Sequence, residues 1–126
     1  MRTAKSLLWL DCSGALLVGA LVLAFAHWLS TLYALPVGFV ITMGAANLAY
    51  GGYAFSLARR AVRPRAQLLL LATANITWAV LCAVATALLA KEASFFGLAH
   101  LVFEGAYVGC LGLVEWKYLD ALQTAA

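Results

Sequence analysis

The sequence predicts an all-α integral membrane protein, a four-helix up-down-up-down bundle with both termini cytoplasmic. Of the 126 residues, 66% are hydrophobic and only 10% are charged, against roughly one quarter in soluble domains. The mean hydropathy is +0.97, and four long apolar runs are separated by short polar segments. So few polar groups cannot cover the surface of a small soluble domain. An ordinary globular enzyme, a disordered chain and a disulfide-stapled secreted module are therefore excluded.

Each apolar run has the length of a membrane-spanning helix, because about 20 residues at 1.5 Å each cross a hydrocarbon core of roughly 30 Å. The predicted spans are 6–29, 36–57, 66–90 and 95–116. Pro36 suits the first turn of the second helix, Pro64 interrupts the loop before the third, and Ser94 suits the N-cap of the fourth. The short connections require antiparallel neighbours, so residues 1–126 are expected to form one four-span domain.

The basic residues gather on one side of this predicted bundle. Seven of the eight precede span one, fill the middle loop or follow span four: Arg2, Lys5, Arg59, Arg60, Arg63, Arg65 and Lys117. Only Lys91 lies on the other side. The positive-inside rule then predicts cytoplasmic termini and a multi-pass protein of the inner (plasma) membrane. Anionic lipid is a second use for the basic loop, but topogenesis alone explains it, and no nucleic-acid partner is expected.

Polar side chains near the middle of the spans are the candidate functional residues, because amides and carboxylates are costly in lipid. Counted along their spans, Asn47, Asn75 and Glu104 lie within about one helical turn of the midplane. A carboxylate at that depth costs on the order of 3 kcal/mol. Glu104 is therefore expected to face the bundle interior and to be protonated or paired.

Each of these three residues has an aromatic residue three positions further along, on the same helix face. The predicted ligand-binding residues are therefore Asn47, Tyr50, Asn75, Trp78, Glu104 and Tyr107. His100 lies one turn before Glu104, where it can exchange protons with it. Amides, a carboxylate and aromatic rings at one depth are typical of a small-molecule pocket between helices.

This pattern leaves three functions open. The first is binding or transport of a small lipophilic or cationic molecule at the midplane, with Glu104 as the proton- or cation-responsive group. The second is an intramembrane enzyme, isomerase-like, with Glu104, Tyr107 and His100 as catalytic acid/base residues acting on a lipid-phase substrate. The third is an accessory or structural subunit, which predicts no cavity and a direct pair between Glu104 and Asn47, Asn75 or a tyrosine.

Two further acids lie near the predicted cytoplasmic interface. Asp11 and Glu115 are expected to snorkel to that interface. The alternative is that spans one and four pair there, with Lys5 or Lys117 as counter-ion.

No cofactor or metal is predicted. Cys12, Cys82 and Cys110 lie in apolar stretches, where a thiol acts as a small hydrophobe. The chain has no C-x-x-C motif or Cys/His cluster. His27 and His100 are the only histidines and have no haem-attachment motif.

The remaining signals concern packing. Gly105 and Gly109 form a G-x-x-x-G motif that Gly112 extends. This strip predicts either internal packing or a parallel homo-oligomer, with membrane lipids as the other partner. An offset of 57 residues places Asn47 on Glu104, so the two halves of the chain resemble two copies of one helical hairpin.

Overall fold

The structure, a computed structural model, describes the backbone of residues 2–123 and the side chains of residues 6–123. This part is helical without strands, which confirms the all-α prediction. The helices are α1 (Arg2–Ala24), α2 (Ala26–Tyr33), α3 (Val37–Ala58), α4 (Arg65–Leu89), α5 (Phe95–Lys117) and α6 (Leu119–Gln123). The side chains of Arg2 and Lys5, two of the predicted topogenic charges, lie outside the described residues.

Three helical segments are long and apolar enough to cross a membrane: Ser6–Ala24, Arg65–Leu89 and Phe95–Lys117. The membrane class of the protein is confirmed to this extent. The 22-residue α3 is not among them. It contains no charged residue, but it carries the polar side chains of Asn47, Tyr50 and Tyr53.

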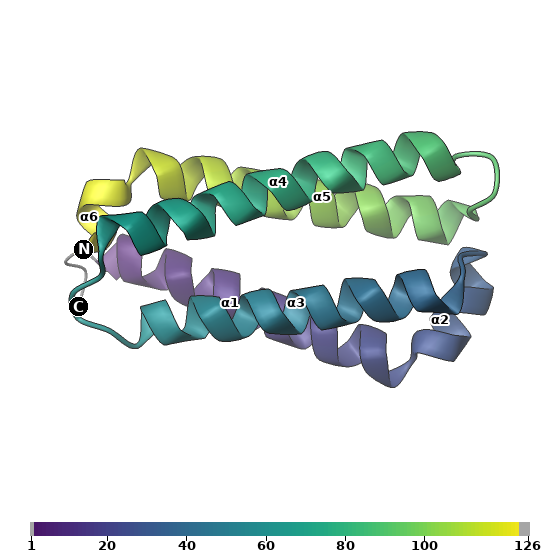
Figure 1. The fold of residues 1–126 in the computed structure, drawn as a ribbon, viewed down its shortest axis with the longest axis horizontal. Helices are drawn as coiled ribbons and strands as arrows, with labels where there is room; N and C mark the ends of the chain where they lie inside the picture. The colour runs from purple at the N-terminus through teal and green to yellow at the C-terminus, as the bar shows by residue number, and fades with distance from the viewer. Residues whose placement is uncertain (1, 124–126) are drawn as a thin grey trace.

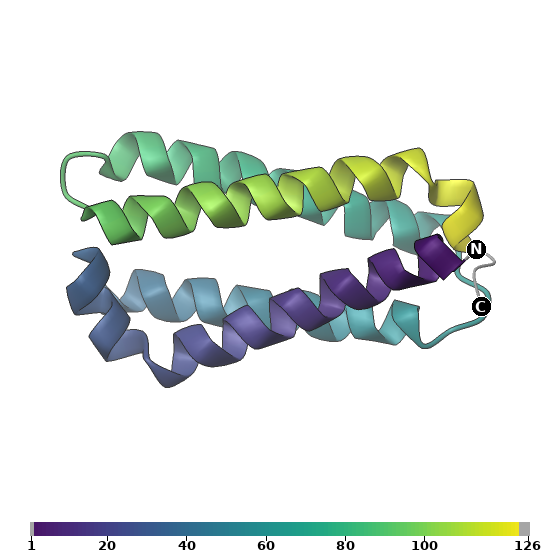
Figure 2. The same cartoon turned by 180° about the vertical axis from the view of Figure 1, so that it is seen from behind.

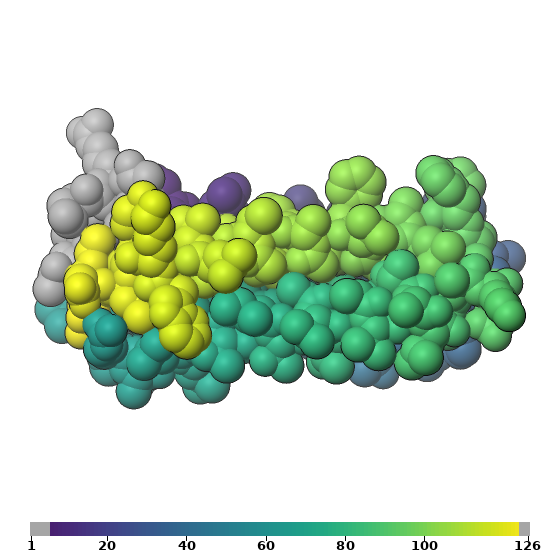
Figure 3. All heavy atoms as spheres, turned by 90° about the horizontal axis from the view of Figure 1, so that it is seen from above, coloured from purple at the N-terminus to yellow at the C-terminus, as the bar shows by residue number. Residues whose placement is uncertain are grey.

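The four long helices form two hairpins (Figure 1, Figure 2). α1 packs along α3, and α4 packs along α5, whereas α3 meets α4 and α1 meets α5 at few points. These hairpins correspond to the two halves of the chain that the 57-residue offset relates. The α4–α5 hairpin covers most of one face of the molecule (Figure 3). Because the two hairpins contact each other at few points, a binding site can form between them.

The first predicted span is interrupted at Phe25, where α1 ends and α2 begins. Neither proline nor glycine marks this break, and the backbone bond from Leu29 N to Phe25 O (2.8 Å) is kept. The change of direction brings the end of α2 to the start of α5. There Ser94 N donates to Tyr33 O (2.8 Å), and Ser94 Oγ donates to Leu32 O (2.6 Å). Tertiary contacts thus decide the break.

Arg63, one of the four arginines of the basic middle loop, is buried. Its side chain is 1% exposed. The guanidinium donates to the backbone carbonyls of Leu57 (2.6 Å), Ala58 (3.1 Å) and Leu122 (2.9 Å). Burial lowers the pKa of Arg63 from its usual value, but arginine stays charged in proteins. Arg63 therefore joins the end of α3 to α6, a short helix that the sequence did not predict.

The predicted glycine strip of α5 packs against α4 within the same chain. A Cβ added at Gly105 would lie 3.0 Å from Cys82 Cβ, and one at Gly112 would lie 3.0 Å from Ala72 O. Of the two uses predicted for the strip, internal packing is the one found. A similar close approach joins α1 to α3, where a Cβ at Gly19 would lie 2.9 Å from Gly44 O.

Gly19→Ala is therefore expected to lower the free energy of unfolding by about 1–3 kcal/mol relative to Gly52→Ala. Both substitutions replace a helical glycine and gain the same helix propensity. The added methyl group meets the α3 backbone at Gly19 but open space at Gly52. Unfolding of both variants in mixed micelles measures the difference, and equal stabilities would contradict the close packing of α1 on α3.

Candidate functional site

The structure divides the polar residues into two clusters, where the sequence predicted one pocket. The Glu104 cluster lies toward α2 and consists of Glu104, Asn47, Trp78, His100, Cys82 and Tyr33. The Asp11–Glu115 cluster lies toward α6 and consists of Asp11, Tyr50, Asn75 and Glu115. Each cluster joins helices from both hairpins.

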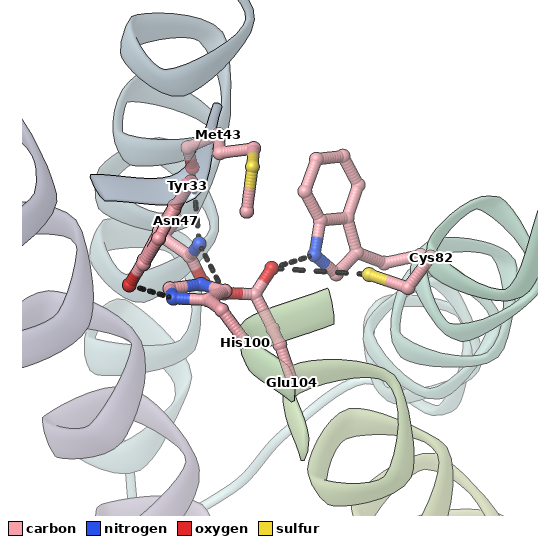
Figure 4. Close-up of polar contacts among 7 residues, drawn as sticks. Tyr33, Met43, Asn47, Cys82, His100 and Glu104 are labelled. Atoms are coloured by element: carbon pink, nitrogen blue, oxygen red, sulfur yellow. Dashed lines mark hydrogen bonds and ion pairs between the residues drawn. The ribbon is translucent and has the colours of Figure 1, made fainter. Parts of the chain in front are cut away.

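Glu104 reaches from α5 to the other helices and uses both of its carboxylate oxygens (Figure 4). Oε1 accepts a hydrogen bond from Asn47 Nδ2 (3.2 Å) and lies 3.0 Å from His100 Nε2. Oε2 accepts from Trp78 Nε1 (2.5 Å) and from Cys82 Sγ (3.9 Å). Since a carboxylate has about four acceptor positions, these contacts occupy all of them. The expectation that Glu104 is buried and paired fits this geometry.

His100 connects Glu104 to the end of α2. Its Nδ1 lies 2.9 Å from Tyr33 Oη, and its Nε2 lies 3.0 Å from Glu104 Oε1. A neutral ring with its proton on Nε2 satisfies both contacts, because Nδ1 then accepts from the phenol. Tyr33, His100 and Glu104 thereby form a continuous hydrogen-bonded chain. Sequence reasoning missed Tyr33, whose contact with His100 depends on the break at Phe25.

In the Asp11–Glu115 cluster, one amide nitrogen holds two carboxyl groups. Asn75 Nδ2 donates to Asp11 Oδ2 (3.1 Å) and to Glu115 Oε1 (2.8 Å). Tyr50 Oη also donates to Asp11 Oδ2 (2.6 Å). Asp11 and Glu115 are 1% and 0% exposed. Among the side chains that the structure describes, Glu115 Oε2 has no hydrogen-bond partner.

The expectation that Asp11 and Glu115 snorkel to the interface is therefore wrong. Leu119 and Leu122 of α6 pack into the core at this end and cover it. The proposed counter-ion Lys117 lies over the Tyr118 ring instead (5.5 Å). The side chain of the other, Lys5, lies outside the described residues.

The separation of Asn75 from Glu104 has a geometric cause. Asn75 lies ten residues into α4, whereas Glu115 lies only two residues before the end of α5. The start of α4 extends past the end of α5 by about two helical turns, and α6 fills the space beside it. A depth counted from the end of each predicted span ignores this offset, so it places Asn75 at the wrong level relative to the residues of α5. Asn75 and Tyr50 therefore face Asp11 and Glu115.

A cavity of about 480 Å³ lies between α1 and α5 and reaches α3. Its polar lining comes from both clusters: Asp11, Asn47, His100 and Glu104. The other walls are apolar, and the ring of Tyr107 forms one of them while its hydroxyl donates to Leu10 O (3.1 Å). Leu17 and Phe103 also line the cavity and are 61% and 76% exposed. The cavity therefore extends to the apolar outer surface.

A smaller cavity of about 170 Å³ lies between α3, α4 and α5. It receives the remaining predicted ligand-binding residues, because Asn47, Tyr50, Asn75 and Trp78 all line it. The predicted set is thus split between two adjacent cavities, with Asn47 on both. The signals for Asp11 and Glu115 were present in the sequence as membrane acids, but their contacts with Asn75 were hidden by the offset of α4.

Within residues 6–123, no group of three or more His, Cys, Asp and Glu side chains is arranged to hold a metal ion. Cys12, Cys82 and Cys110 are free thiols. No known protein family matches the chain, and neither a curated protein nor a solved structure is significantly similar to it.

Proposed function

We propose that this chain is a four-span protein of the inner (plasma) membrane that binds a small lipophilic cation, as a step toward its transport. Both termini are cytoplasmic in this proposal, because the basic residues Arg59, Arg60 and Lys117 lie at the end where α1 begins and α6 lies. The observation that carries the binding proposal is the 480 Å³ apolar cavity that Asp11 and Glu104 both line.

The proposal treats α3 as the fourth span. At 22 residues it is about 33 Å long, which matches the hydrocarbon thickness. Its polar groups have partners inside the protein: Asn47 donates to Glu104, Tyr50 to Asp11 and Tyr53 to Gln67 O. These residues reduce the apolar character of the sequence without exposing polar groups to lipid, so α3 can cross the membrane as part of the bundle.

Charge and shape favour a lipophilic cation as the ligand. Hydrogen bonds donated to the Glu104 carboxylate stabilise its charge, and a cation roughly 5–6 Å away would gain about 3 kcal/mol at an effective dielectric constant of about 20. The apolar walls and the Tyr107 ring suit a hydrophobic body. The exposed rim at Leu17 and Phe103 gives such a ligand access from the bilayer.

The contacts of Glu104 also separate this proposal from its alternatives. A general base needs a free lone pair for the substrate proton, and the four contacts of Glu104 leave none, which disfavours isomerase-like catalysis by this residue. A quaternary cation needs charge but no hydrogen-bond acceptor. The Asn47–Glu104 pair agrees with a purely structural polar layer, but that hypothesis also expected no cavity beside Glu104.

Equilibrium binding of tetraphenylphosphonium to the protein in nanodiscs tests the proposal. Glu104→Gln is expected to weaken binding tenfold or more, a loss of about 1.4 kcal/mol or greater. Ala15→Leu should also weaken binding, because Ala15 lines the cavity and the larger side chain fills it without changing the charge. Glu92→Gln is the matched control, since Glu92 is an exposed acid away from the cavity.

Unchanged affinity in both Glu104→Gln and Ala15→Leu, with wild-type thermal unfolding, would contradict the proposed site. Failure of the wild-type protein to bind the cation would contradict the proposed ligand class.

A further inference from the structure

Among the side chains of residues 6–123, the Asp11–Glu115 cluster contains two acids and no matching cation. Asp11 comes from α1 and Glu115 from α5, and both accept from the single nitrogen Asn75 Nδ2. Neither acid contacts a basic side chain within residues 6–123, where Arg65 pairs with Asp120 and His100 contacts Glu104. The two carboxyl groups are thus side by side and fully buried.

Glu115 Oε2 is the second, independent observation. It is a buried polar atom for which the described part of the chain supplies no hydrogen-bond partner, and such an atom costs about 1–3 kcal/mol unless something satisfies it. A proton on one of the two acids removes this cost, because a protonated carboxyl is also a donor. A proton is therefore enough to satisfy Glu115 Oε2, and no larger ligand is required there.

Electrostatics points the same way. Two ionised carboxylates in contact and away from water repel each other strongly, so one of such a pair keeps its proton. Within residues 6–123, the titratable groups around the pair are the phenols of Tyr50 on α3 and Tyr107 on α5 and the thiol of Cys12 on α1, which are side chains that carry no charge at pH 7 at their ordinary pKa values. α4 contributes only the amide of Asn75, and α6 covers the end with leucines.

We propose that Asp11 and Glu115 together hold one proton in the folded protein, and that a cation entering the 480 Å³ cavity displaces it. Asp11 makes this coupling possible because it belongs to the pair and also lines the cavity. The O–H bond of the carboxylic acid breaks, its electron pair stays on the carboxylate, and the proton passes to water. One cation replaces one proton, so the net charge of the site is unchanged.

The exchange of a proton for a cation rests on the proposed cation site, whereas the proton shared by Asp11 and Glu115 does not. The two are therefore tested by separate measurements. Infrared spectroscopy of the ligand-free protein in nanodiscs at neutral pH reports the carbonyl stretch of a protonated carboxylic acid. This band is expected in the wild type and in Glu92→Gln, and it should be lost in both Glu115→Gln and Asp11→Asn. Absence of the band in the wild type, or its persistence in both cluster variants, would overturn the shared proton.

Proton release during tetraphenylphosphonium binding, measured in weakly buffered solution, tests the exchange. About one proton per bound cation is expected, so the affinity should rise up to tenfold per pH unit while the pair is protonated. His100 also lines the cavity, but it remains present in Glu115→Gln. Loss of the release in that variant therefore assigns it to the pair.

The outcomes distinguish the two proposals. Cation binding without proton release would overturn the exchange and leave the binding site standing. An infrared band that is present without any cation binding would support the shared proton and overturn both the cation site and the exchange that depends on it.

Discussion

Arg63→Ala is expected to lower the free energy of unfolding by roughly 3–5 kcal/mol, because three backbone carbonyls lose their donor and each costs about 1–3 kcal/mol when buried and unpaired. These carbonyls belong to Leu57, Ala58 and Leu122, at the ends of α3 and α6. Some of the cost is offset where water reaches the end of the bundle. Unfolding by denaturing detergent in mixed micelles measures the change.

Arg59→Ala is the matched control, since Arg59 is exposed and contacts the face of the Phe55 ring (5.4 Å). Its loss should cost under about 1 kcal/mol. Both substitutions remove one positive charge from the same loop, so an effect on membrane orientation would be similar in the two. Arg63→Lys should rescue little, because one ammonium group cannot reproduce the planar fork that serves three carbonyls. Equal stabilities of Arg63→Ala and Arg59→Ala would refute the structural role.

Most of the helical framework could be predicted from the sequence because local signals mark its ends. Pro36 and Pro64 precede α3 and α4, and Ser94 caps α5 through a hydrogen bond from Gly97 N (3.3 Å). The break at Phe25 and the short α6 have no such signals. Both depend on contacts with residues distant in the sequence, as the bonds of Ser94 to Tyr33 and Leu32 illustrate.

Much of the Glu104 cluster could be predicted because it depends on depth and helix faces. Asn47, Trp78 and His100 were expected beside Glu104 and do contact it. In the Asp11–Glu115 cluster, a pairing of spans one and four was only the alternative prediction, and the place of Asn75 in it was missed. Asn75 reaches the two acids because α4 starts about two turns beyond the end of α5, and hydropathy cannot reveal an offset between neighbouring helices. Hydrophobic periodicity predicts the face of the helix on which a residue lies. The residues that it contacts depend also on how far neighbouring helices are displaced along their axes.

The contacts that this displacement creates at Asn75 should be about as sensitive to substitution as those of Arg63. Asn75→Leu keeps the branching of the side chain and removes the amide that holds Asp11 and Glu115; the larger side chain adds the same volume in the comparison variant at Asn47. Because two buried carboxyl groups then lose a common donor, we expect a loss of roughly 3–5 kcal/mol in the free energy of unfolding. The same unfolding assay measures it.

Asn47→Leu provides the comparison, since it replaces a second buried amide that donates to a membrane carboxylate. Glu104 retains three other contacts there, so this variant should lose only about 1 kcal/mol. Adding Glu115→Gln to Asn75→Leu should restore part of the stability, because the new amide can donate to Asp11 and one acid is removed. A double-mutant cycle measures this coupling. If Asn75→Leu is no more harmful than Asn47→Leu, or if Glu115→Gln brings no recovery, the two acids are not held together through Asn75.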